Sequence, residues 1–163
     1  AAAAPGREVV CITGDGSIQM NLQELQTILS NAYPVKIFMY NNNGYLSIKL
    51  TQNAFFNGHF VGSTPESGVH LPDMRKLAEA YGFRTYLLRN NAEAEAQLPE
   101  ILALDGPVFC EVMTDPLEKL GPKASSMRLP DGRIVSRPLE DLAPFLPREE
   151  FKANMIIPTV EEK

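Results

Sequence analysis

Two short apolar runs, each closed by a glycine-containing turn, constrain the fold of this chain most strongly. Residues 8–13 are followed by the turn GDG at residues 14–16, and residues 35–40 by the turn NNNG at residues 41–44. Runs of this kind predict buried strands. Residues 21–31 between them have the spacing of an amphipathic helix. A strand, a helix and a strand within about 33 residues form a βαβ unit, whose two strands are parallel.

The next part of the chain continues this alternation. Helices are predicted over residues 73–81 and 92–104, and strands over residues 84–88 and 107–113. Residues 45–70 have no clear period, and we expect a short helix followed by an ordered loop there. The predicted fold class is therefore α/β, an open parallel sheet with helices on both faces.

The last third of the chain is rich in proline, since eight of the 13 prolines of the whole chain lie between Pro107 and Lys163. This stretch is too apolar for a disordered linker and too rich in proline for regular structure. We therefore predict two parts, a domain over residues 1–113 and a C-terminal arm over residues 114–163 that wraps the domain or a partner subunit. A small hairpin is expected between residues 128 and 134, around an Asp-Gly turn.

Composition excludes two classes of partner. The 163 residues carry 15 Lys+Arg against 20 Asp+Glu without a basic cluster, which argues against a nucleic-acid-binding groove. No apolar run approaches the roughly 20 residues that span a membrane. Cys11 and Cys110 each lie in an apolar run, so we expect two buried thiols in a reducing cytoplasm. The chain opens on four alanines without an initiator Met, and we expect it to be part of a longer protein.

The two glycine-containing turns carry the chemistry. Ligands of an open parallel sheet bind beyond the carboxyl ends of its strands, so Asp15 and Asn42 are expected to face one small site. Carboxylate, amide and carbonyl oxygens suit Mg²⁺ or Ca²⁺, and phosphate oxygens complete the coordination. Gly16 lets the backbone approach such an anion closely. From the residues alone, a magnesium–diphosphate site and two ordinary structural turns stay open as alternatives.

The residues also resemble a known family. The sequence GDGSIQMNLQELQT, followed about two dozen residues later by YNNNGYLS, resembles the thiamin-diphosphate-binding motif of thiamin-dependent enzymes. The runs VVCITGDGSIQMNLQELQT and KLAEAYGF are most similar to the large (catalytic) subunit of acetolactate synthases. The resemblance covers residues 1–113 and implies a C-terminal cofactor-binding domain with the thiamin-diphosphate-binding fold.

This resemblance implies roles for individual residues. Asp15, the side chain of Asn42 and the backbone carbonyl of Gly44 would bind Mg²⁺. The backbone amides around Gly16 and Ser17 would contact the diphosphate. Tyr45 and Leu46 would lie beside the cofactor. The full set of implied cofactor-binding residues is Gly14, Asp15, Gly16, Ser17, Asn42, Gly44, Tyr45 and Leu46.

The resemblance also implies an activity and partners. Such an enzyme decarboxylates a 2-oxo acid such as pyruvate and transfers the two-carbon unit to a carbonyl acceptor. Its activating Glu belongs to a separate pyrimidine-binding domain, contributed by a partner subunit of a homodimer or homotetramer, and FAD is a candidate cofactor of a middle domain. No catalytic residue is therefore assigned in this chain, and we expect the isolated chain to be inactive.

One departure concerns the substrate. Acetolactate synthases typically carry a Trp in a stretch resembling VRQWQELFY, whereas Thr51 stands at that position here and the chain has no Trp. Beside ordinary acetolactate synthesis, the departure therefore leaves open a carboligase with another acceptor, such as an activated sugar or another aldehyde. Two alternatives stay open, a simple thiamin-dependent 2-oxo acid decarboxylase and a non-catalytic phosphate-binding α/β module.

Overall fold

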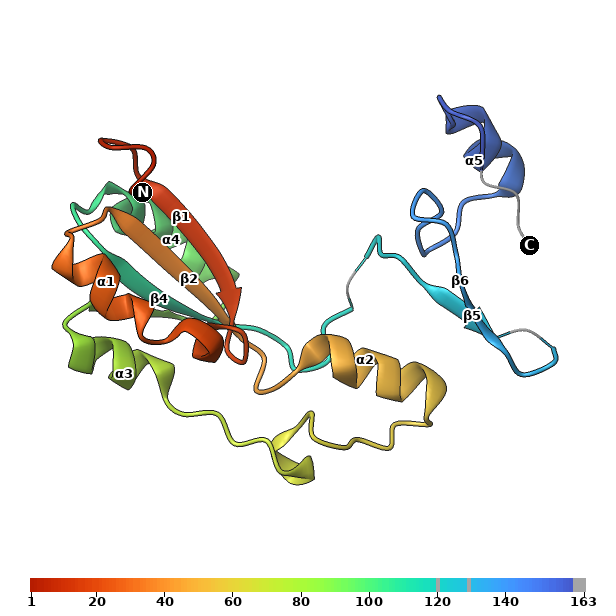
Figure 1. Cartoon of the computed structure of the whole chain (residues 1–163), viewed down its shortest axis with the longest axis horizontal. Coiled ribbons are helices and arrows are strands. Elements are labelled where there is room, and N and C mark those ends of the chain that lie inside the picture. Colours follow the sequence, from red (N-terminus) through yellow and green to blue (C-terminus); the bar gives the residue numbers. More distant parts are fainter. Residues whose placement is uncertain (120, 129, 160–163) are drawn as a thin grey trace. The chain divides into compact units, whose positions relative to one another are not determined.

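The structure, a computed structural model, describes residues 1–119, 121–128 and 130–159 (Figure 1). The chain forms two compact units, Ala1–Glu118 and Lys119–Lys163. Throughout the described ranges, every helix is too short or too polar to cross a lipid bilayer.

The first unit contains an open sheet of four parallel strands. Their order across the sheet is β1 (Val9–Gly14), β2 (Val35–Asn41), β4 (Val108–Met113) and β3 (Arg84–Leu88). β4 thus lies between β2 and β3, although β3 precedes it along the chain. The predicted open parallel sheet is confirmed.

Helices cover both faces of this sheet, as predicted (Figure 1). Successive residues of a strand point to opposite faces, so β2 contributes to two hydrophobic cores. One core joins β2 and β4 to α1 (Glu24–Ser30) and α3 (Met74–Tyr81) through the buried side chains of Leu25, Ile37, Met39, Met74, Ala78 and Phe109. The other joins β2, β3 and β4 to α4 (Asn91–Ala103) through Phe38, Leu88, Ile101, Val108 and Cys110.

The segments that follow β1 and β2 leave the sheet at its carboxyl edge. A short 3-10 helix, η1 (Ile18–Asn21), precedes α1, so the α-helix is shorter than the predicted range of residues 21–31. After β2 the chain enters α2 (Leu46–Phe55), followed by an irregular loop with a second 3-10 helix, η2 (Pro65–Ser67). The expected short helix and ordered loop are therefore confirmed.

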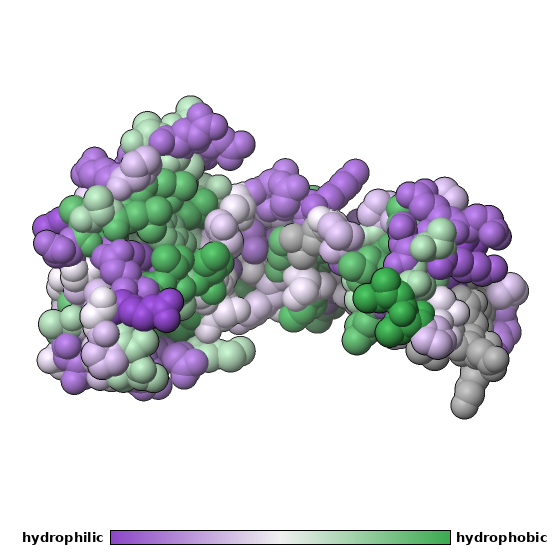
Figure 2. Space-filling model, turned by 90° about the horizontal axis from the view of Figure 1, so that it is seen from above, coloured by the Kyte–Doolittle hydropathy of each residue, from purple (hydrophilic) through white to green (hydrophobic). Residues whose placement is uncertain are grey.

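The prediction that the first strand is buried was wrong. β1 is an edge strand, and its Val10 and Ile12 side chains are 52% and 64% exposed. Both side chains line a cavity of about 500 Å³, which also reaches Phe38 of β2 and Leu98 of α4. Hydrophobic residues accordingly lie at the surface of the first unit (Figure 2). Cys11 is exposed as well, which corrects the expectation of two buried thiols, whereas Cys110 is buried.

The second unit has its own small framework. The antiparallel strands β5 (Ser126–Arg128) and β6 (Ile134–Ser136) form the predicted hairpin, and α5 (Arg148–Asn154) follows. Asp141 is 2% exposed and accepts hydrogen bonds from Arg137 and Arg148. Residues 120, 129 and 160–163 of the predicted arm lie outside the described residues, so the arm's role as a wrapping segment stays a prediction.

Candidate functional site

The two glycine-containing turns meet at the carboxyl edge of the sheet. β1 and β2 pair directly in parallel, and Gly14 at the end of β1 lies opposite Tyr40. The backbone amide of Asp15 then donates a hydrogen bond of 3.0 Å to the carbonyl oxygen of Tyr40. The two strands therefore pair, which is the condition for Asp15 and Asn42 to share one site.

The carboxylate of Asp15 connects the two turns. Its side chain is 3% exposed, its Oδ1 accepts from the amide of Gly16 at 2.8 Å, and its Oδ2 accepts from the amide of Gly44 at 3.1 Å. A carboxylate has about four lone-pair directions, so these two bonds leave acceptor capacity on both oxygens. Asp15 can therefore hold the turns together and still bind a cation.

Asn42 supplies the observation that points to a ligand. Its Oδ1 atom is buried and accepts no hydrogen bond from any described residue. An unpaired buried amide oxygen costs about 1–3 kcal/mol, and such groups are rare in folded proteins. A bound cation would satisfy this oxygen.

The glycines of the turns allow contacts that a side chain would prevent. A Cβ atom on Gly16 would lie 2.4 Å from Cε1 of the Tyr45 ring, so the ring packs directly against this turn. A Cβ atom on Gly44 would lie 2.3 Å from the backbone oxygen of Ser63, which also accepts a hydrogen bond of 3.1 Å from the amide of Tyr45. The two turns and the loop after α2 therefore form one packed unit.

Lys49 of α2 is a buried cation at this site that the sequence did not reveal. Its side chain is 1% exposed, and its Nζ donates a hydrogen bond of 2.9 Å to the backbone carbonyl of Asn42. Burial lowers the pKa of Lys49, while the negative charges of Asp15, Asp115 and Glu66 oppose this shift. The helix containing Lys49 was predicted only as a short element without a clear period, so no signal marked this residue.

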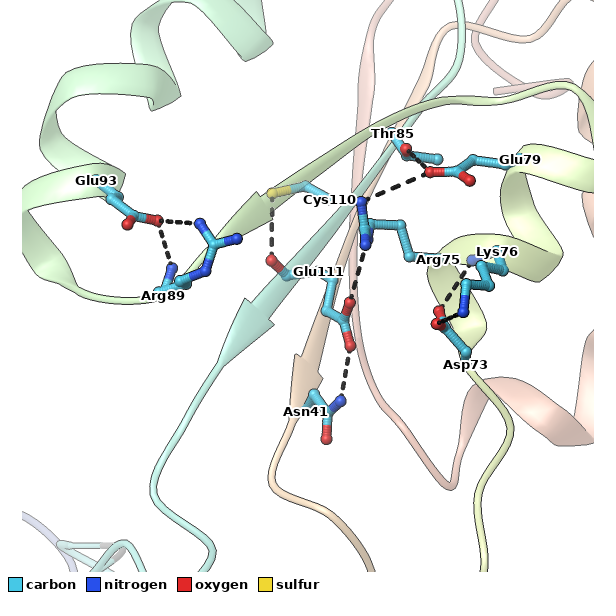
Figure 3. A network of polar contacts seen from close by, with 10 residues as sticks. All are labelled: Asn41, Asp73, Arg75, Lys76, Glu79, Thr85, Arg89, Glu93, Cys110 and Glu111. Carbon is cyan, nitrogen blue, oxygen red and sulfur yellow. Dashed lines mark hydrogen bonds and ion pairs between the residues drawn. The ribbon is translucent and has the colours of Figure 1, made fainter.

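A network of polar side chains beside the site was also not predicted from the sequence (Figure 3). Asn41 at the end of β2 donates a hydrogen bond of 2.7 Å from Nδ2 to Oε1 of Glu111 on β4. Oε2 of Glu111 lies 3.7 Å from Nε of Arg75 on α3. Glu111 is 9% exposed, and a charged residue inside an apolar strand was the only sequence signal for this network.

The structure brings most of the predicted site residues together. Asp15, Gly16, Gly44 and Tyr45 contact one another, whereas Asn42 is joined to the site through Lys49. Three further predicted residues lie at the ends of elements: Gly14 is the last residue of β1, Ser17 directly precedes η1, and Leu46 is the first residue of α2. The cofactor and metal roles of all these residues stay predictions.

The donor set fits Mg²⁺ by its chemistry. The carboxylate of Asp15, the backbone carbonyl of Gly44 and the amide oxygen of Asn42, which is buried and has no partner among the described residues, are all hard oxygen ligands. Mg²⁺ is usually held by one or two carboxylates and completed by phosphate oxygens. The observed residues therefore suit a magnesium ion that also binds a diphosphate.

Comparison with known proteins identifies the family. Residues 1–112 match the family described as thiamine pyrophosphate enzyme, C-terminal TPP binding domain. The acetolactate synthase large subunit of Porphyra purpurea is 36% identical over 112 residues, which cover 68% of this chain and 19% of that protein. The large subunit of Haemophilus influenzae is 35% identical over 140 residues, covering 85% of this chain and 24% of the relative. The isozyme 2 large subunit of Escherichia coli (strain K12) is 34% identical over 141 residues, with coverages of 86% and 24%.

The chain thus spans about a fifth to a quarter of the length of these relatives. The family match, by contrast, extends over most of the first unit and includes both turns of the candidate site. The parallel sheet and the meeting of the two turns at its carboxyl edge agree with this match. The chain therefore belongs to the thiamine pyrophosphate enzymes and carries their C-terminal TPP binding domain, in a form similar to that of acetolactate synthase large subunits.

Proposed function

We propose that this chain binds Mg²⁺ and the diphosphate of thiamin diphosphate at the carboxyl ends of β1 and β2. The observation that carries the proposal is the buried Oδ1 of Asn42, which lacks a hydrogen-bond partner among the described residues. It belongs to the same pair of turns as the buried carboxylate of Asp15. A divalent cation between these oxygens would remove the cost of the unpaired acceptor.

In the proposed site, the chain's own residues bind and orient the cofactor. Asp15, Asn42 and the carbonyl of Gly44 hold the cation, and the turn at Gly16 allows close approach of the diphosphate. When bound, thiamin diphosphate would supply a nucleophilic carbanion, and its cationic thiazolium ring would be the electron sink for loss of CO₂. The residues described here anchor the cofactor and take no part in bond breaking.

For the reaction, we propose decarboxylation of a 2-oxo acid such as pyruvate and transfer of the two-carbon unit to a carbonyl acceptor. The support comes from the relatives, which are acetolactate synthases. These relatives are four to five times longer than the region they share with this chain. We therefore propose that a pyrimidine-binding domain, contributed by a partner subunit of a homodimer or homotetramer, supplies the activating Glu, and that FAD belongs to a middle domain if the enzyme uses it.

The acceptor is proposed to differ from that of ordinary acetolactate synthesis. Thr51 lies on α2, is exposed, and donates a hydrogen bond of 3.1 Å from Oγ1 to the carbonyl of Ser47. The hydroxyl is thus already paired within its helix, and its small side chain does not supply the flat apolar surface of an indole. An acceptor larger or more polar than pyruvate, such as another aldehyde or an activated sugar, suits this position better.

Calorimetric titration of thiamin diphosphate into the intact protein, with and without Mg²⁺, tests the cofactor site. We expect binding that requires the metal and that weakens about tenfold or more in Asp15→Ala, because the variant loses the charged metal ligand. Asp105→Ala is the matched control, since it removes an exposed carboxylate from the turn before β4. Binding that is absent, or insensitive to both the metal and Asp15→Ala, would contradict the proposal.

A further inference from the structure

Both polar atoms of the Asn41 side chain, and its backbone carbonyl oxygen, form hydrogen bonds at the end of β2. Its Oδ1 accepts a hydrogen bond of 3.0 Å from the amide of Asn43, and its Nδ2 donates one of 2.7 Å to Glu111. Its backbone carbonyl accepts from the amide and the Oγ1 of Thr114 at 2.9 and 3.2 Å. Both partners outside the turn, Glu111 and Thr114, belong to β4 or follow it directly.

The bond to Asn43 fixes the backbone of the turn. Asn43 has a φ angle of +55°, in the left-handed region that few residues other than glycine adopt readily. The side chain of Asn41 supports this conformation by accepting from the Asn43 amide, in the manner of an Asx turn. Asn42 lies between these two residues, so the direction of its buried Oδ1 depends on both of them.

Glu111 determines which way the Asn41 amide points. A side-chain amide has an acceptor at one end and a donor at the other, and rotation by 180° exchanges them. An ionised carboxylate is acceptor-only, so Glu111 requires Nδ2 of Asn41 on its side and leaves Oδ1 for the amide of Asn43. Arg75, whose Nε lies 3.7 Å from Oε2, keeps a positive charge beside this carboxylate (Figure 3).

We propose that Glu111 is a positioning residue for magnesium, acting through Asn41 to hold the turn in which Asn42 presents its metal-binding oxygen. The inference rests on the proposed function. It extends the site to β4, which Asn41 at the start of the second turn contacts, and adds a charged residue that is itself outside both turns.

A donor–acceptor exchange tests this proposal. Asn41→Asp places two carboxylates against each other, and we expect the Kd for Mg²⁺ at saturating thiamin diphosphate to rise about tenfold or more at pH 8. Glu111→Gln alone keeps an acceptor for Nδ2, and we expect less than about a threefold change. In the double variant the new amide donates to the new carboxylate, which still accepts from the amide of Asn43, so the Kd should return to within about threefold of the wild-type value.

The control is Glu79→Gln on α3, which alters the same network at an exposed carboxylate that pairs with Thr85 and Arg75. Its Kd for Mg²⁺ should stay unchanged. Folding of every variant is followed by circular dichroism and thermal unfolding.

Each result decides a separate question. If the wild-type protein binds no cofactor in the presence of Mg²⁺, the proposed function fails and this inference fails with it. If the wild-type protein binds while Asn41→Asp binds equally well, or stays weak in the double variant, only the positioning role is overturned. An unfolded Asn41→Asp variant also overturns it, because the contact would then support the fold rather than the turn.

Discussion

Gly44→Ala is the substitution whose effect the structure defines best. Gly44 has a φ angle of +138°, and a Cβ atom there would lie 2.3 Å from the backbone oxygen of Ser63. The oxygen belongs to the backbone, so a rotation of a flexible side chain cannot relieve the contact. The turn must move, which breaks the hydrogen bond of 3.1 Å between Tyr45 and Ser63 or the one of 3.1 Å between Gly44 and Asp15.

The expected cost combines two contributions. A non-glycine residue in a sparsely populated backbone region costs about 1–3 kcal/mol. Loss of one buried hydrogen bond adds about 0.5–1.5 kcal/mol. We therefore expect the free energy of unfolding to fall by about 2–4 kcal/mol, which corresponds to a decrease in Tm of roughly 5–15 °C for a chain of this size.

Gly62→Ala is the matched control for this substitution. Gly62 also has a positive φ angle, of +59°, but a Cβ atom there would meet no atom within 4 Å. This variant carries only the conformational cost, about 1 kcal/mol. The assay is urea unfolding followed by circular dichroism, together with the Kd for Mg²⁺. Equal destabilisation by the two substitutions would refute the reasoning, because it would show that the contact with Ser63 costs nothing.

Three further predictions concern groups outside the cofactor site. Burial, and secondarily the charge of Glu111, raises the pKa of the Cys110 thiol from 9.0 to about 12. Between these two pKa values the unfolded chain loses a proton that the folded chain keeps, so the free energy of unfolding should fall with rising pH by up to about 1.4 kcal/mol per pH unit. Urea unfolding at pH 9 and at pH 11 measures this fall, which should be smaller in Cys110→Ala than in the wild-type protein. A thiol-reactive chromophore should label one cysteine, Cys11, in the folded protein and two in denaturant, and labelling of both without denaturant would contradict the burial of Cys110. In the second unit, hydrogen bonds from Arg148, followed by those from Arg137, lower the pKa of the Asp141 carboxyl. The stabilisation from these hydrogen bonds is present above the ordinary pKa of Asp and is lost as the pH falls below that value. Limited proteolysis should therefore cut the second unit faster at pH 3 than at pH 7, whereas the Asp141→Asn variant should be cut fast at both pH values.

Local chemistry made several elements predictable. The helix over residues 73–81 begins after Asp73, whose side chain accepts a hydrogen bond of 3.0 Å from the amide of Lys76, and ends at Gly82, which has a φ angle of +108°. The strand over residues 84–88 was predicted with the bounds that the structure shows. Such features depend on residues a few positions apart, so the sequence records them directly.

The candidate site was predictable only in part. Asp15 and Asn42 were expected to share a site because each follows a strand of one βαβ unit, and the pairing of those strands is confirmed. Lys49 and Glu111 were not found, since a single Lys or Glu in an apolar segment carries no pattern that identifies what it contacts.

Strand and helix periods and turn residues act over short stretches of chain, so the residues alone were enough to predict the α/β alternation, the family and the two turns at Gly14–Gly16 and Asn41–Gly44. Three features became visible only in the folded chain: β4 lies between β2 and β3, β1 is an exposed edge, and Glu111 contacts Asn41 across 70 residues. Those features depend on which distant segments pair and on which faces become covered. Pairing of this kind follows from packing of the whole sheet, and no short segment of the chain specifies it.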